Sequence, residues 1–454
     1  MVFPIAGGNE SKGYEISNSL RFNDGDSPRL TKTPSGAGNK RTWTFSAWVK
    51  KCMPLTGGNQ RLIACGSGTG VKFSSIEFDS SDRIRILEGT ESGSATTVVN
   101  GVGNNRDPSA WYHVVVKYDS TQGTAADRIE IYLNGVEVTY SSTTYPAQNY
   151  DSEFNNTVVH TIGASSIGGS VASFLDGYMT EVHLVDGAAK APTDFGEFDE
   201  DSPTIWKPKD VSDLTFGTNG FHLNYETAAE LGTDANGGTA LSETNLTALN
   251  QSTDTCTNNF TIWNGLTPRR SDITLTEGNL NVTMGGTSRG IFATIGVSSG
   301  KWYYEAKWVS GSYFQTGVVA TDTMNDNDDV YGGKTGAFMY KQDGNIRSGG
   351  STLASVSSLS TGDIVGVALD MDNDRVYFYK NGAIQNSGTG FDISAYSEYT
   401  FGCAPTSTTL SGNFGSPSFA ISSGNADGNG YGNFEYAVPS NYFSLNTKNL
   451  SEFG

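Results

Sequence analysis

Carboxylate-rich stretches are the first places where this 454-residue chain could carry out catalysis. Glycoside hydrolysis needs two carboxyl groups on one strand face, one as acid and the other as nucleophile or base. The nearest approach is the sequence GEFDED, in which Glu197, Asp199 and Asp201 alternate. These residues lie in a proline-rich connection without an apolar strand around them. We therefore predict no catalytic pair and no enzymatic activity.

The histidines are scattered singly, at His113, His160, His183 and His222. No HExxH pair or GxSxG turn is present to supply a metal site or a nucleophile. His113 and His183 fall within strand patterns, where we expect hydrogen-bonded or exposed histidines rather than catalytic ones.

The cysteines, Cys52, Cys65, Cys256 and Cys403, are far apart and show no CxxC spacing. Neither a zinc site nor a thioredoxin-like motif is indicated. We expect isolated thiols, with a Cys52–Cys65 bridge across a hairpin as the alternative.

Two acidic stretches offer the oxygen ligands that calcium prefers. In DTMNDNDD the candidate calcium ligands are Asp322, Asp326 and Asp328, and a solvated loop is the competing interpretation. The second stretch, DMDND at residues 370–374, is better explained as a hairpin turn, because Asp and Asn accept turn geometry. Calcium is the only cofactor that the sequence leaves open.

Exposed aromatic side chains that stack on sugar rings, with polar groups nearby, would indicate a glycan site. The candidates lie in the sequences YSSTTYPAQNY and GSYFQTG, and they are Tyr140, Tyr145, Tyr150, Tyr313, Phe314 and Gln315. Each could equally belong to the core or to a subunit contact.

The charge balance limits the partners. The chain has 29 basic and 48 acidic residues and a net charge of -19, so it would repel a phosphate backbone. No run of about 18 apolar residues could cross a bilayer, and Met1 is not followed by a secretory-signal pattern. We expect neither nucleic-acid binding nor membrane insertion.

Alternating strand patterns dominate both halves of the chain. TWTFSAWVK (residues 42–50), YHVVVKY (112–118) and KWYYEAKWV (301–309) each place apolar residues on one face. RIRIL (83–87) alternates arginine with isoleucine, as expected of an antiparallel strand with one wet face. DIVGVALDMD (363–372) is apolar on both faces and should be a central strand.

Two hairpins share a sequence pattern. Asp127–Gly135 and Asp374–Gly382 are identical at five of nine positions, and both end in Asn-Gly, the strongest short signal for a two-residue turn. We interpret them as one architecture used twice, with chance similarity as the alternative.

Chain length requires at least two cores. We predict an all-β protein of two tandem antiparallel β-sandwiches of the concanavalin-like, jelly-roll type, with very little helix. Residues 1–15 would form a docking arm, 16–190 the first sandwich, 191–267 a linker, 268–430 the second sandwich and 431–454 a closing segment. Within the linker, YETAAELG (225–232) could form one short helix.

Several segments resemble known families. NSLRFNDGDSPRLTKTP (18–34), TWTFSAWVK, WYHVVVKYD, IEIYLNG and FLDGYMTEVHLVDGAA (174–189) together resemble a laminin-G-like, concanavalin-like lectin domain of the kind found in phage structural proteins. SGKWYYEAKW, GDIVGVALDMDNDRVYFYKNG and SGNFG resemble a SPRY domain. TNGFHLNYE, TNNFTIWNGL and PSNYFSLNTKNL resemble segments that flank such domains in phage tail and particle proteins.

The resemblance implies recognition or particle assembly, because such families bind glycans or protein segments through rim loops or a curved sheet face. We expect a non-enzymatic virion protein of a bacteriophage (tail fibre, tail-associated or capsid-decorating), displayed on the particle surface after synthesis in the host cytoplasm. Its expected partners are other virion proteins, host-surface polysaccharide and further copies of itself. The alternatives are a secreted or surface lectin-like bacterial protein and a polysaccharide depolymerase.

Overall fold

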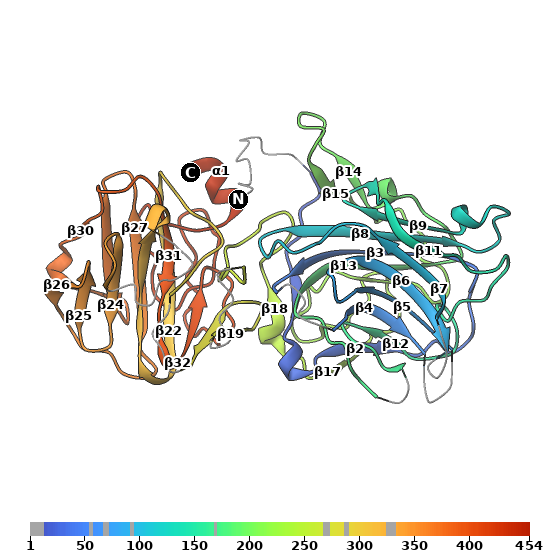
Figure 1. The fold of residues 1–454 in the computed structure, drawn as a ribbon, viewed down its shortest axis with the longest axis horizontal. Helices are drawn as coiled ribbons and strands as arrows, with labels where there is room; N and C mark the ends of the chain where they lie inside the picture. Colours follow the sequence, from blue (N-terminus) through green and yellow to red (C-terminus); the bar gives the residue numbers. More distant parts are fainter. Residues whose placement is uncertain are drawn as a thin grey trace. The chain divides into compact units, whose positions relative to one another are not determined.

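The computed structural model describes residues 13–53, 58–66, 72–90, 95–167, 170–266, 273–285, 290–323 and 333–454. The chain forms two compact units, Ser11–Thr257 and a unit that contains Asn258–Gly454. Each is a β-sandwich (Figure 1), which confirms the predicted all-β fold class. Within the described residues, no helix has the length and apolar character needed to cross a bilayer.

The first sandwich (Ser11–Thr257) consists of two eight-stranded antiparallel sheets. Sheet A has the order β10 (Val136–Glu137), β9 (Ile129–Leu133), β8 (Trp111–Asp119), β3 (Thr42–Lys51), β13 (Gly177–Asp186), β1 (Ser19–Phe22) and β18 (Gln251–Ser252), with β16 (Phe221–Leu223) paired to β13. Sheet B has the order β11 (Tyr140–Thr144), β7 (Ala95–Gly101), β6 (Ile84–Thr90), β5 (Lys72–Phe78), β4 (Gln60–Cys65), β12 (His160–Ile162), β2 (Arg29–Lys32) and β17 (Ser242–Thr244).

The hydrophobic core lies between these two sheets, on the strand faces that the alternation of apolar residues predicted to be buried. Trp43, Phe45 and Val49 point inward from β3 and are fully buried. They join Ile76 and Ile86 of sheet B in one hydrophobic cluster. Burial of such apolar side chains is the main favourable term in folding of the sandwich.

The linker predicted at 191–267 is wrong, because residues from Asn258 onward belong to the second sandwich and residues 191–257 belong to the first. They supply β16, β17 and β18, and also a small sheet of β14 (Gly196–Phe198) and β15 (Trp206–Pro208). These strands have only two or three residues, too few to show a period of two in the sequence. The predicted helix at 225–232 is also wrong, because Tyr225 has a left-handed backbone (φ 59°) and turns follow it.

We call residues 191–257 the covering segment, because they bury the outer face of sheet A. Phe195, Val211 and Phe216 of the segment pack on Val115 and Val185 of the sheet.

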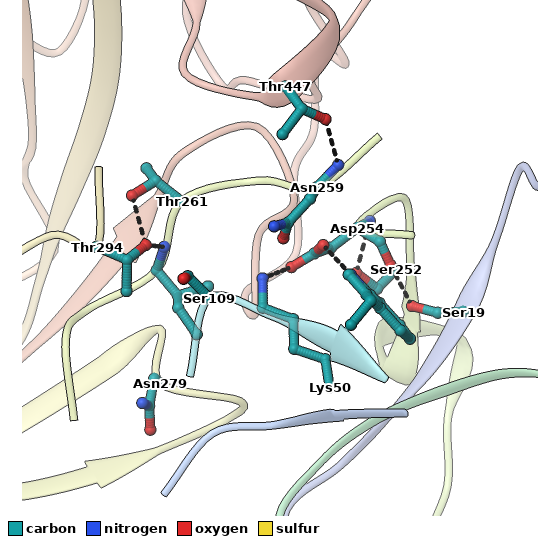
Figure 2. A network of polar contacts seen from close by, with 12 residues as sticks. Ser19, Lys50, Ser109, Ser252, Asp254, Asn259, Thr261, Asn279, Thr294 and Thr447 are labelled. Atoms are coloured by element: carbon teal, nitrogen blue, oxygen red, sulfur yellow. Dashed lines mark hydrogen bonds and ion pairs between the residues drawn. The ribbon is translucent and has the colours of Figure 1, made fainter. Parts of the chain in front are cut away.

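Farther along the segment, the carboxylate of Asp254 accepts a 2.7 Å bond from Lys50, and its carbonyl accepts one from Ser19 (Figure 2). Lys50 and Asp254 are both almost fully buried. The covering segment therefore buries the part of the outer face of sheet A that it contacts.

The second sandwich (Asn258–Gly454) also has two main sheets. Sheet C has the order β19 (Ile273–Thr276), β20 (Asn281–Met284), β32 (Thr406–Asn413), β22 (Lys301–Tyr313), β27 (Ile364–Asp370), β28 (Arg375–Lys380) and β29 (Ala383–Ile384), with β30 (Phe391–Asp392) on β28 and β33 (Phe443–Ser444) on β22. Sheet D has the order β21 (Ile291–Phe292), β31 (Tyr399–Cys403), β23 (Gln315–Ala320), β24 (Ala337–Lys341), β25 (Asn345–Ser348) and β26 (Ser351–Ser355).

Aromatic residues fill the space between sheets C and D. Tyr304 of β22 packs on Phe401 of β31 with ring centroids 4.4 Å apart, and Tyr340 of β24 contacts Phe378 of β28. DIVGVALDMD forms the fully buried strand β27, between β22 and β28, as predicted.

The chain end also covers a sheet. Phe434, Val438 and Tyr442 pack on Tyr303, on the outer face of sheet C. The chain finishes in β33 and the helix α1 (Thr447–Phe453), which Asn446 caps through its side chain. The expected closing segment is thus an integral part of the second sandwich. Of the predicted arm, residues 1–12 lie outside the described residues.

The two related hairpins adopt the same structure. Asn134-Gly135 and Asn381-Gly382 both have positive φ at the two central positions (48° and 78°, 47° and 77°). In each, the Asn side chain accepts a 2.8 Å bond from the backbone N–H of the preceding strand, at His113 and Ile364 respectively. The same hairpin structure is therefore present in both halves of the chain.

Candidate functional site

A row of polar side chains crosses the outer face of sheet B. Direct pairing between neighbouring strands aligns one residue from each of five strands, in the order Arg61, Glu77, Arg85, Asn100 and Ser142. The first four lie on the face opposite the core, because residues next to them along each strand point inward, and Ser142 is paired directly with Asn100 at the edge of the sheet. We call these five residues the polar row.

Glu77 organises the polar row. Its carboxylate is fully buried and accepts a 2.7 Å hydrogen bond from Arg85 Nε. It also forms an ion pair with Arg61, whose Nε lies 2.6 Å from the carboxylate. The arginine side chains remain 11% and 18% exposed. Burial lowers the pKa of Arg61, although the charge of Glu77 opposes that shift.

The polar row has unsatisfied hydrogen-bonding capacity. Arg61 Nη1 and Asn100 Oδ1 are buried without a hydrogen-bond partner. Buried polar atoms are normally satisfied by protein, water or ligand. The two arginines also outnumber the single glutamate, so the row carries a local positive charge on an acidic protein. Hydroxyl and carboxylate groups are the ligands that such a surface can bind.

The three tyrosines predicted to contact glycan in the first sandwich are half-buried. Tyr140 and Tyr145 pack against the core, and the Tyr140 hydroxyl donates a 2.9 Å bond to Glu137. Tyr150 lies under the ammonium group of Lys72, 5.2 Å from the ring centre. Contacts within the protein therefore cover much of the surface of each tyrosine ring.

For the second sandwich, the prediction of a glycan contact is wrong at Phe314 and Gln315. Both side chains are fully buried, and Gln315 donates to the carbonyl of Ala404. Alternation beyond Tyr313 points Phe314 into the sandwich, where it stacks on Trp308. Tyr313 is half-buried beside Lys341.

The acidic stretches have different outcomes. Asp322 lies in a short 3₁₀ turn (Thr321–Thr323), whereas Asp326 and Asp328 lie outside the described residues. Calcium binding there stays a prediction. Residues 370–374 form the expected turn, in which Asp370 accepts a 3.0 Å bond from the backbone of Asn373. Glu197 and Asp199 both pair with Lys207 in the covering segment, away from the polar row.

Three of the histidines lie on the outer face of sheet A or on the strand paired to it. His113 is buried and bonded to Ser46 and to the indole of Trp206, each at 2.9 Å. This is the hydrogen-bonded strand histidine that we expected.

His183 differs from His113, because the register pairs it with His222 on β16 beside the carboxylate of Glu181. Burial lowers the pKa of His183 to about 4. Burial would raise the pKa of Glu181, but the two neighbouring imidazoles lower it to about 2.

Sequence reasoning missed both clusters for the same reason. The alternating arginines of RIRIL did indicate that Arg85 points outward. Nothing local, however, revealed that Glu77 and Asn100 would lie beside Arg85, because strand register is set by the whole sheet. His183 and His222 meet only because a three-residue strand returns to pair with β13.

The comparisons place both sandwiches in known domain families. Residues 24–193 match the concanavalin A-like lectin/glucanases superfamily, and residues 301–415 match the SPRY domain. The chain therefore contains a concanavalin-like domain followed by a SPRY domain, as the resemblance implied. The polar row lies wholly within the first match. No curated protein matches the sequence.

Solved structures resemble single parts of the chain. The SPRY domain of human HERC1 is 19% identical, and the match covers 29% of this chain and 87% of that one with a TM-score of 0.26. The heptameric SAP-like pentraxin from Limulus polyphemus is 16% identical over 39% and 80% of the two chains, with a TM-score of 0.29. The TRIM65 PSpry domain is 13% identical over 34% and 91%, with a TM-score of 0.29.

Proposed function

We propose that this protein is a non-enzymatic recognition protein that binds polysaccharide through the polar row of sheet B. The observation that carries the proposal is the row itself, which aligns two guanidinium groups, a carboxylate and an amide on one sheet face. The match of the same sandwich to a lectin-containing superfamily supports it.

The chemistry of the row favours a sugar that bears carboxylate groups. The partly exposed guanidinium groups can donate charge-assisted hydrogen bonds to a carboxylate, and the exposed Ser142 hydroxyl can bond to a sugar hydroxyl. Glu77 holds both guanidinium groups in place before binding, so little side-chain entropy is lost when the ligand arrives. Leu87 and Val98 pair directly beside the row and are half-buried, which offers an apolar strip to a ring face.

Calorimetric titration of purified acidic polysaccharides into the full chain tests this site. We expect the Arg85→Ala variant to lose binding by roughly tenfold or more, because one charge-assisted bond contributes about 1.5–3 kcal/mol. Lys117→Ala is the matched control, since it removes one cation from the outer face of sheet A, where Lys117 pairs with Glu130. Equal affinities of the two variants would refute the site. Release of reducing ends from the polysaccharide would instead identify a depolymerase.

We further propose that the chain works on a bacteriophage particle, joined to other virion proteins and to further copies of itself. The flanking segments 218–226, 257–266 and 439–450, which resemble those of phage tail and particle proteins, support this placement. Mass spectrometry of purified particles, followed by cryo-electron microscopy, would test it. Absence of the chain from particles would contradict the virion placement and favour a surface lectin, while leaving the polar row to be tested separately.

A further inference from the structure

An irregularity in β13 turns a carboxylate toward the outer face of sheet A. Met179, Val182 and Leu184 point into the core, whereas strict alternation from Met179 would have placed residue 181 inside as well. The register of β13 against β3 shifts between Thr180 and His183, and Glu181 has a left-handed backbone with φ 49°. This β-bulge re-aims Glu181 to the side of His183, as bulges commonly do at functional sites.

Two imidazoles converge on that carboxylate from neighbouring strands. His183 of β13 and His222 of β16 are directly paired, with ring centroids 4.5 Å apart. Their Nε2 atoms lie 3.3 Å and 2.9 Å from the same oxygen, Oε2 of Glu181. One ligand atom from each of the three residues falls within 4.8 Å of the others.

The three side chains are almost completely buried and incompletely satisfied. Glu181, His183 and His222 are 3%, 2% and 8% exposed. Neither ring nitrogen of His183 makes a hydrogen bond, and its closest polar contact is the 3.3 Å approach to Glu181. Phe195 and Phe216 of the covering segment pack against the rings and shield them from bulk solvent. An unsatisfied histidine in such a place is costly unless it has a further partner.

We propose that Glu181, His183 and His222 bind one divalent transition-metal ion, of which zinc is the best match. Two imidazole nitrogens and one carboxylate oxygen form a known three-residue zinc set, in which water takes the fourth position. Donor atoms around a tetrahedral zinc lie roughly 3.3–3.6 Å from each other, so the present separations need only small adjustments. A dication would also neutralise the buried carboxylate.

The position of the site gives the metal a structural role. His222 belongs to the covering segment, and Glu181 and His183 belong to sheet A. Asp234 fixes the strand that carries His222 by accepting a 3.0 Å bond from its backbone N–H. Bound zinc would join the covering segment to the sheet, and it would stabilise the folded state because the unfolded chain does not preform the site.

The competing interpretation is a metal-free hydrogen bond between His222 and Glu181. To distinguish the two, the full chain is stripped with a chelator, checked for its fold by circular dichroism, and titrated with Co²⁺ and then Zn²⁺. We expect one Co²⁺ per chain with the visible absorption of a low-symmetry site, displacement by Zn²⁺, and a higher midpoint of thermal unfolding with metal.

Variants separate specific binding from general damage. His222→Gln removes a ligand from a short edge strand and should weaken Co²⁺ binding by at least roughly tenfold. His160→Gln is the control, because it removes another buried histidine, one that accepts from the backbone N–H of Asn155. His160→Gln should still bind one Co²⁺. Failure of the folded, stripped protein to bind Co²⁺ or Zn²⁺, or unchanged binding by His222→Gln, would overturn the proposal.

Discussion

At the scale of single residues, the second sandwich also buries a carboxylate on the outer face of a sheet. Glu305 of β22 accepts bonds from the backbone N–H groups of Glu435 and Tyr436, at 2.9 Å and 2.8 Å. Its other partners are the amide of Asn413 and the hydroxyl of Tyr303. Glu305 therefore holds the closing segment on sheet C, as Glu181 contacts the covering segment on sheet A.

The protonation of Glu305 should make stability depend on pH. Burial raises the pKa of Glu305 to about 7 from 4.5, although the hydrogen bonds to it act in the opposite direction. The folded state then holds the proton more tightly than the unfolded chain does. The resulting stabilisation is complete below about pH 4.5 and is lost as pH rises through about 7, with a magnitude on the order of 3 kcal/mol.

Urea unfolding between pH 4.5 and 8 measures this effect. As pH rises, we expect the free energy of unfolding of the wild type to fall relative to that of Glu305→Gln, because the amide of the variant cannot ionise. Glu452→Gln, which removes an exposed carboxylate from the same sandwich, should run parallel to the wild type. Parallel curves for Glu305→Gln and the wild type would contradict the raised pKa.

The polar row, unlike a buried carboxylate such as Glu305, shows what can be predicted about single residues from sequence. Strand alternation correctly predicts that Arg85 points outward, and it fails at Glu181 because a bulge changes the face. The glycan-site interpretation of GSYFQTG misplaced Phe314 and Gln315, because an exposed aromatic motif and a buried one look alike in sequence. The sites depend on register and bulges, which arise from contacts between distant strands.

At the scale of elements, the repeated hairpin has a second shared feature. A Cβ atom added at Gly135 would lie 2.4 Å from the ring of Trp206, and one added at Gly382 would lie 2.7 Å from the ring of Tyr436. In both sandwiches, an aromatic residue from the segment after the matched domain thus packs on the Asn-Gly turn. Glycine is needed at this position for two reasons: it adopts positive φ without strain, and it leaves room for the aromatic ring.

Replacing Gly382 with alanine should therefore destabilise the second sandwich in two ways. A left-handed non-glycine residue costs about 1–2 kcal/mol, and the contact with Tyr436 adds to that cost. Gly430→Ala is the matched control, because Gly430 has a similar φ of 82° and open space at its Cβ position. Urea unfolding should show a larger loss for Gly382→Ala than for Gly430→Ala. Equal losses would mean that Tyr436 moves aside without cost.

At the scale of the whole molecule, each sandwich extends beyond its matched domain. The matches end at residues 193 and 415, whereas the compact units continue to Thr257 and Gly454. The two sandwiches and their main strands were predictable from sequence, because long strands show a clear period of two. The covering segment was not, because it contacts the sheet through short strands, turns and isolated side chains such as Asp254.

The first sandwich should consequently need residues 191–257 to fold. A fragment of residues 11–257 retains both sheets and the covering segment, and we expect it to be soluble and to unfold in one cooperative transition. A fragment that ends at residue 193 loses Asp254, the partner of buried Lys50, and exposes Val115 and Val185. Removing one member of a buried ion pair alone costs about 3–5 kcal/mol, a large part of the stability of a typical domain.

Expression of the two fragments, followed by dye binding to exposed apolar surface and by thermal unfolding, measures the difference. The shorter fragment should aggregate, or bind the dye and lose its cooperative transition. An Asp254→Asn variant of the longer fragment separates the two causes, because it keeps the apolar cover and removes only the charge that pairs with Lys50. If the fragment ending at residue 193 unfolds as cooperatively and at the same temperature as the longer one, the covering segment is dispensable and the matched domain is the true folding unit.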